Sequence, residues 1–161
     1  MIKDEIEKLK KIQQAILDYL DNYENDTVDS KKIINFLDDE CISKNTYLFR
    51  DFLCLISYIS NYHQKTQFFW EKIDFILIHF QKEIKENFSD STIFNIFKNN
   101  KRILYFLFNN NVLIMNNDLF KILNNEYQDD PSNLLYFMKE IRPFIDHYSF
   151  SDLKNRYPAI S

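Results

Sequence analysis

The stretch TQFFWEKIDFILIHFQKEIKENF, residues 66–88, decides the fold of this chain. Its apolar side chains recur every three or four residues, which is the period of an α-helix and not of a strand. Within residues 73–80 the only polar residues are Asp74 and His79. A helix that is apolar nearly all round is packed on more than one side. The stretch therefore predicts a central helix over about residues 67–88, with a core centred on Ile73, Ile76, Leu77 and Phe80.

The same helical period continues on both sides of this stretch. Residues 2–21 place apolar side chains on one face and Lys and Glu on the other, and residues 46–62 form a similar amphipathic pattern. Three short segments, 93–97, 103–107 and 119–123, are each followed by paired asparagines. Pro131 suits the first turn of a further helix, and a last short segment runs over 150–157. We predict one all-α domain over residues 1–161, with about eight or nine helices stacked as hairpins around the central helix and a solenoid-like second half.

The chain contains no glycine. Phosphate-binding loops, dinucleotide fingerprints and glycine-flanked nucleophile elbows are therefore excluded, and tight β-hairpins are disfavoured. Helices can end without glycine if asparagine takes the left-handed conformation after the last turn. Asparagines cluster where such ends would fall, at residues 99–100, 109–111, 116–117 and 124–125. At helix starts, the sequence offers Ser30, Asn45 or Thr46, and Asn100 as caps, and Thr66 as the beginning of the central helix.

Composition limits the class of protein. Hydrophobic residues make up 45% and aromatic residues 17% of the chain, which argues against disorder. The formal net charge is −4, so the chain lacks the broad basic surface that nucleic acid or anionic membranes select. The apolar runs are far shorter than a membrane span, and the charged first residues are unlike a secretion signal. With Cys41 and Cys54 forming no CxxC pair, we expect a cytoplasmic protein with reduced thiols.

No residue pattern for catalysis, cofactor binding or metal binding is present. His63, His79 and His147 are too far apart for a metal motif. Cys54 is interpreted as a plain thiol at the margin of the core. Acidic runs at residues 38–40 and 129–130 are interpreted as solvated charge at helix ends or connections. We therefore expect no catalytic residue, no cofactor and no metal.

Lys101 and Arg102 are at odds with local helix electrostatics. With Asn100 as cap they occupy the first turn of a helix, where the helix dipole disfavours cations by about 0.3–1 kcal/mol. One interpretation is an internal salt bridge or carbonyl contact that holds neighbouring helices in register. The other is a cationic finger for an acidic partner. In the second case, aromatic residues left exposed near helix ends would be its anchors, and the predicted partner-binding set is Lys101, Arg102, Tyr105, Phe108 and Tyr148.

One series of motifs resembles a known family. Its most specific part is IFNIFKNNKRIL, residues 93–104, and EIRPFI at 140–145 belongs to it as well. The remaining motifs are Asn61-Tyr62-His63, Phe68-Phe69, Lys72-Ile73, Ile76-Leu77, Ile84-Lys85, Phe88-Ser89 and Tyr136-Phe137. Together they resemble the helical domain of unknown function that precedes ankyrin repeats in many proteins of trichomonad protists. The resemblance covers about residues 12–146. It departs from the family at Gln64, and at Met138-Lys139, where a proline would be expected.

The resemblance implies an interaction or scaffolding role, with no catalytic residue to carry over. Ankyrin repeats would be expected to begin near Ser161, where the chain ends. The chain is then either a stand-alone family member or part of something longer.

Two functions of different classes follow from the sequence. The first is an adaptor or scaffold that docks a protein partner on a helical face. The second is a structural component of a cytoskeletal or flagellar assembly, with the acidic surface of tubulin as a possible partner for Lys101 and Arg102. A small enzyme ranks well behind both. Neither the partner nor the oligomeric state can be read from the residues.

Overall fold

The computed structural model describes residues 2–23 and 27–141, and these ranges contain only helices, turns and loops. They form nine α-helices and one short 3₁₀ helix, with no strand. The predicted all-α fold class and the predicted number of helices are confirmed. The chain divides into two compact units, Met1–Asn87 and Phe88–Ser161.

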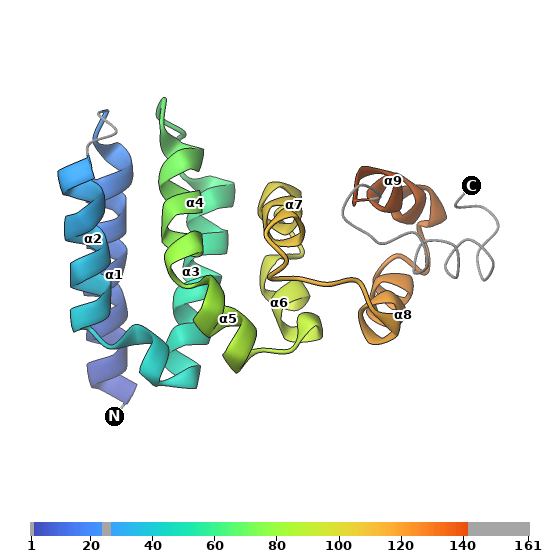
Figure 1. Cartoon of the computed structure of the whole chain (residues 1–161), viewed down its shortest axis with the longest axis horizontal. Helices are drawn as coiled ribbons and strands as arrows, with labels where there is room; N and C mark the ends of the chain where they lie inside the picture. The colour runs from blue at the N-terminus through green and yellow to red at the C-terminus, as the bar shows by residue number, and fades with distance from the viewer. Residues whose placement is uncertain (1, 24–26, 142–161) are drawn as a thin grey trace. The chain divides into compact units, whose positions relative to one another are not determined.

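The first unit is built from two helical hairpins. Helices α1 (Ile2–Asp21) and α2 (Thr27–Asp39) form the first, and the 3₁₀ turn η1 (Ile42–Lys44) leads into the second. That hairpin comprises α3 (Thr46–Tyr62) and α4 (Phe69–His79), which α5 (Gln81–Asn87) follows. Contacts of α1 with α3 and of α2 with α4 pack one hairpin against the other (Figure 1).

The core of this unit includes the residues that were predicted to form its centre. Ile73, Ile76, Leu77 and Phe80 are all buried, as predicted. The Phe80 ring lies 5.7 Å from the ring of Phe49 and 5.5 Å from that of Phe52, both fully buried on α3. This aromatic cluster joins α3 to the end of α4.

The single helix predicted over 67–88 is wrong in its continuity, because Phe80 separates α4 from α5. Phe80 departs from helical geometry, with φ −98° and ψ 6°. Its ring is enclosed between those of α3, while backbone hydrogen bonds still run from Phe80 to Ile76 and from Ile84 to Phe80. The predicted start at Thr66 is also wrong. The Thr66 hydroxyl instead donates to the carbonyl of Leu20, at 3.0 Å.

The second unit consists of shorter helices, described as far as Ile141. They are α6 (Asp90–Phe97), α7 (Lys101–Asn109), α8 (Asn117–Glu126) and α9 (Pro131–Ile141). Each of the three short predicted segments lies within one of the first three, and α9 begins at Pro131 as expected. The buried Phe137 of α9 lies between 6.0 and 6.4 Å, ring to ring, from Phe94, Tyr105 and Tyr127. The helix predicted over 150–157 lies outside the described residues.

Asparagine caps helix starts, as predicted for Asn45 and Asn100, and Asn116 caps a third. The three residues begin α3, α7 and α8, since each side-chain oxygen accepts a backbone N–H of the first turn. Within the described residues, Asn111 is the only asparagine in the left-handed conformation, with φ 59°. The left-handed conformation expected at the other asparagine clusters is therefore wrong, although α6 and α8 do end beside two of them. Ser30 is not a cap, because it lies inside α2 and its hydroxyl bonds to that of Tyr19 at 2.9 Å.

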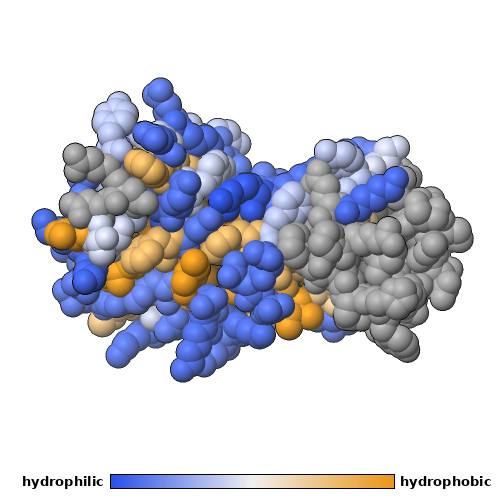
Figure 2. Space-filling model, turned by 45° about the horizontal axis from the view of Figure 1, so that its top comes forward, coloured by the Kyte–Doolittle hydropathy of each residue, from blue (hydrophilic) through white to orange (hydrophobic). Residues whose placement is uncertain are grey.

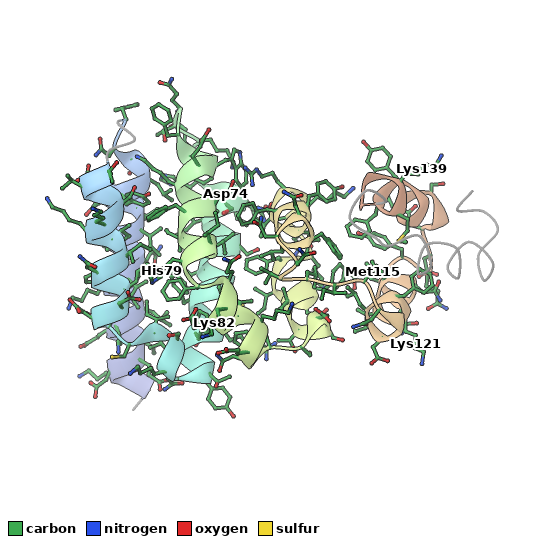
Figure 3. The ribbon with its side chains drawn as sticks, in the orientation of Figure 1. Asp74, His79, Lys82, Met115, Lys121 and Lys139 are labelled. Carbon is green, nitrogen blue, oxygen red and sulfur yellow. The ribbon has the colours of Figure 1, made fainter. Side chains whose placement is uncertain are left out.

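Two carboxylates of the acidic run at residues 38–40 contact side chains of other helices instead of remaining merely solvated. The imidazole Nε2 of His79 lies 2.9 Å from a carboxylate oxygen of Asp38, and Figure 3 shows His79 on the side of α4 toward α2. Lys11 of α1 reaches Glu40 at 2.9 Å. Exposed pairs of this kind contribute about 0–1 kcal/mol each. No helix in the described ranges is both long and apolar enough to cross a membrane.

Candidate functional site

Lys101 and Arg102, the cations predicted to bind a partner, lie exposed in the first turn of α7. Asn100 caps this turn, accepting the backbone N–H of Ile103 at 3.0 Å. The Lys101 ammonium lies 5.0 Å from the ring centre of Tyr136, and the Arg102 guanidinium lies 6.0 Å from that of Phe106. Each cation thus covers an aromatic ring, a contact worth about 0.5–1 kcal/mol at an exposed position.

The two predicted aromatic anchors that the structure describes, Phe108 and Tyr105, are not fully exposed beside these cations. Phe108 is only 2% exposed, so its assignment as an exposed anchor is wrong. It shares the buried face of α7 with Ile103, Leu104 and Leu107. Tyr105 is half-buried, with its ring 6.2 Å from that of Phe137. Its hydroxyl oxygen is buried and has no hydrogen-bond partner among the described residues. Tyr148 lies outside the described residues.

A partly apolar groove with a volume of about 540 Å³ lies between α1 and α3 of the first unit. We call it the α1–α3 groove. Its α1 wall consists of Ile6, Leu9, Lys10 and Gln13, and its α3 wall consists of Asp51, Cys54, Leu55 and Tyr58. Leu9 and Leu55 are half-buried in its floor, while Ile6 and Tyr58 are exposed on its rims.

The α3 rim continues into a row of exposed tyrosines. Positions 47, 51, 54, 58 and 62 follow one another at helical spacing, so they share one face of α3, opposite the buried face that includes Phe49 and Phe52. On this face Tyr47 is 80%, Tyr58 60% and Tyr62 75% exposed. The Tyr58 and Tyr62 rings lie 4.8 Å apart. We call these three residues the tyrosine stripe.

Two opposite charges lie on the facing walls of the groove. Lys10 on α1 and Asp51 on α3 are both exposed. Neither forms an ion pair or a hydrogen bond with any described residue. The groove therefore combines an apolar floor, aromatic rims and one available charge of each sign.

Chemistry at the groove is limited by the state of its thiol. Burial raises the pKa of Cys54 above its usual value, which outweighs the lowering effect of Arg50. Because the thiolate is the nucleophilic form, a raised pKa lowers the fraction of this exposed cysteine that is reactive near neutral pH.

Lys72 is the second unusual group of the first unit, and its role is structural. It is 1% exposed, and its ammonium donates to the carbonyl of Tyr19 at 2.9 Å and to that of Asn22. Burial lowers the pKa of Lys72, while the carboxylates of Asp29 and Asp21 act in the opposite direction. Two of its three donors bond to carbonyls at and just beyond the C-terminal end of α1, so it joins α4 to this end of α1.

Sequence reasoning missed both the groove and the buried lysine. A signal for the groove exists, because Tyr47, Tyr58 and Tyr62 all lie off the apolar face that buries α3. A signal for Lys72 exists too, since it stands beside Phe69, Ile73 and Ile76 on the buried face of α4. Neither signal identifies the groups that face these tyrosines or Lys72 in the fold. Those groups are set by the packing of helices that are distant in the sequence.

Within the described ranges, no group of three or more His, Cys, Asp and Glu residues could hold a metal ion. Comparison with known proteins gives no further guide to the site, since no family model, no curated protein and no solved structure matches this chain.

Proposed function

We propose that this chain is a non-enzymatic protein-interaction or scaffolding domain, which binds a protein partner through the α1–α3 groove and the tyrosine stripe. The observation that carries the proposal is the exposure of Tyr47, Tyr58 and Tyr62 along one helix face beside a partly apolar groove. Tyrosine is enriched in interface cores because it supplies a large contact area with few rotatable bonds and a hydroxyl for hydrogen bonding. Exposed rings gathered beside an apolar hollow thus favour contact with another protein.

Two features of the first unit support a binding role over catalysis. Burial raises the pKa of the Cys54 thiol, which lowers its thiolate fraction. The Lys72 ammonium, which does not line the groove, is buried and donates to two backbone carbonyls. Neither group is therefore activated as a nucleophile. The resemblance to the domain that precedes ankyrin repeats in trichomonad proteins agrees with a scaffolding role in the cytoplasm.

The proposal is tested by removing the exposed tyrosine rings beside the groove and measuring the affinity for the partner. The double variant Tyr58→Ser with Tyr62→Ser deletes two rings of the tyrosine stripe and leaves the buried face of α3 intact. Tyr23→Ser is the matched control, because Tyr23 is 78% exposed and lies outside the groove. With a partner purified from the native cells, the dissociation constant should rise at least about tenfold in the double variant, as expected for hot-spot tyrosines. Equal affinity of the double variant and the control would contradict the proposal.

A second candidate is a structural component of a cytoskeletal or flagellar assembly. It is favoured by the exposed Lys101, whose ammonium covers the ring of Tyr136, itself 57% exposed. A cation beside an exposed ring can bind an acidic protein surface such as that of tubulin.

Co-sedimentation with polymerised microtubules tests this candidate. The double variant Lys101→Glu with Arg102→Glu should lose the salt-dependent part of binding. Lys121→Glu with Lys139→Glu is the charge-matched control, because both lysines are exposed on other helices of the same unit. If wild type stays in the supernatant, the microtubule role is wrong.

A further inference from the structure

We propose that the occupant of the α1–α3 groove is a second copy of this chain, so that the domain forms a symmetric dimer through the face that carries the groove and the tyrosine stripe. This rests on the proposed function, namely that the groove binds protein, and it names the partner.

The first reason is that one face carries both the hollow and the groups that could fill a hollow. The groove has a volume of about 540 Å³, and Tyr58 and Tyr62 project beside it with 60% and 75% of their surface exposed. A two-fold axis places the same patch of each copy against the other, so a patch must be complementary to itself. A patch that has both a groove and projecting rings meets this condition.

The second reason is charge. Lys10 and Asp51 stand on opposite walls of the groove, and neither has an ion-pair or hydrogen-bond partner among the described residues. In a two-fold dimer, Lys10 of each copy can pair with Asp51 of the other, so one contact is formed twice. The face then needs no foreign partner to balance its charges.

The third reason is the small net charge. At −4 it lets two copies approach without strong repulsion. The face of the molecule drawn in Figure 2 is mostly hydrophilic, with apolar patches lying among polar side chains.

Sedimentation of the full chain over a range of concentrations tests the proposal. Wild type should show a monomer–dimer equilibrium. Lys10→Glu alone and Asp51→Lys alone should each weaken it at least about tenfold, because like charges then meet twice across the axis. An equimolar mixture of the two variants should restore association, since all pairs in the mixed dimer are again opposite in sign. Lys31→Glu and Asp39→Lys, exposed charges of α2 outside the groove, are the matched controls and should behave as wild type.

Cysteine labelling gives a second, independent readout. Cys54 lines the groove, whereas Cys41 is exposed elsewhere in the same chain. As the protein concentration rises, the rate of alkylation of Cys54 should fall several-fold relative to that of Cys41. In the Lys10→Glu variant the ratio of the two rates should stay constant.

Each result decides the matter. A chain that remains monomeric throughout, with a constant ratio of labelling rates, overturns the dimer. A dimer that is indifferent to both charge reversals also overturns it, because another face must then be used. Neither result refutes the proposed function, which fails only if Tyr58→Ser with Tyr62→Ser leaves binding of a different protein partner unchanged. If the wild-type dimer is lost in that tyrosine variant, both proposals gain support together.

Discussion

The two units of this chain use different polar bonds to hold their helices. In the first unit, side chains reach backbone carbonyls far away in sequence: Lys72 bonds to Tyr19 across 53 positions and Thr66 to Leu20 across 46. In the second unit, the side chains of Asn100 and Asn116 bond to backbone N–H groups three positions on. The second unit also has long-range contacts, from Asp90 to the backbone of Ile114 at 3.2 Å and from Lys98 to Glu126 at 3.4 Å, but both lie at exposed positions.

Long-range side-chain bonds and helix caps constrain a fold differently. The long-range bonds fix how helices are arranged, whereas the caps fix only where a helix begins. A cap satisfies the first turn of its own helix and leaves the orientation of that helix open. In the described part of the second unit, the buried contacts that orient the helices are therefore largely apolar, with the Phe137 ring near rings from α6 and α7. In the first unit, buried polar bonds from α4 to α1 add a second set of constraints to the packing.

The largest effect is expected from Phe137→Ala, which tests whether apolar packing holds the helices of the second unit. Removing a fully buried ring should destabilise the second unit by about 3–5 kcal/mol, because the cavity cannot close around three ring contacts. Urea denaturation followed by circular dichroism measures the loss. The neighbouring Tyr136→Ala, at an exposed position, should cost less than about 1 kcal/mol. Similar costs for both variants would mean that Phe137 does not organise this unit.

Lys72→Met should have the next largest effect. The substitution keeps an unbranched side chain of similar length but leaves the carbonyls of Tyr19 and Asn22 without their donor. We expect a loss of about 1–3 kcal/mol in the free energy of unfolding. Lys82→Met on the exposed side of α5 is the control and should stay within about 0.5 kcal/mol. A more stable Lys72→Met variant would show that burying the ammonium costs more than its hydrogen bonds return.

Removal of a cap tests the second unit on its own. Asn100→Ala should cost about 0.5–2 kcal/mol, because the backbone N–H of Ile103 loses its acceptor. Asn100→Asp preserves an acceptor and should recover most of the stability. Asn99→Ala, one position earlier and exposed, should be close to neutral. Thermal unfolding of the three variants in parallel would measure this order, and an equal loss at both asparagines would refute the capping role.

The smallest expected effect is a pH dependence that belongs to the first unit alone. Burial lowers the pKa of Lys72 below its usual 10.5, so the folded chain releases this proton at a lower pH than the unfolded chain does. In the window just below 10.5 the unfolded state binds more protons, and the contribution of Lys72 to the free energy of unfolding therefore rises with pH.

The difference between wild type and Lys72→Met isolates this contribution, since Tyr19 and the other titrating groups are present in both. We expect the difference to change in favour of wild type across that window. Chemical denaturation at several alkaline pH values measures it. A difference that is flat with pH, or that falls, would show that the pKa of Lys72 is not lowered in the fold.

Much of the fold is predictable from the sequence because helical periodicity is a local property. Residues 66–88 predicted the buried Ile73, Ile76 and Leu77 correctly, and Pro131 marked the start of α9. The break at Phe80 was not predictable, since it depends on where the rings of Phe49 and Phe52 lie on another helix. Ser30 illustrates the same limit: a helix-capping residue by type, it bonds to Tyr19 because α1 lies beside α2.

The candidate site was less predictable than the fold. For Lys101 and Arg102 the sequence left an internal contact and an exposed cationic finger open, and both residues lie exposed. Phe108 lies in the core, since helical spacing does not by itself say which face is covered. The α1–α3 groove could not be predicted, because it forms only when α1 and α3, which α2 separates in the sequence, pack side by side. In the sequence, the tyrosine stripe could be recognised only as three tyrosines that do not lie on the buried face of α3.

The bond from Lys72 to Tyr19 also sets an order of events during synthesis. Ribosomes add about 5–20 residues per second, so the 53 positions between the two residues correspond to about 3–10 s of translation. During that delay α1 has left the ribosome without the partner that covers its C-terminal carbonyls, and its apolar side, with Ile12 and Ile16, remains uncovered by α4. The nascent chain thus presents its first helix to chaperones and to neighbouring nascent chains before its own fourth helix exists.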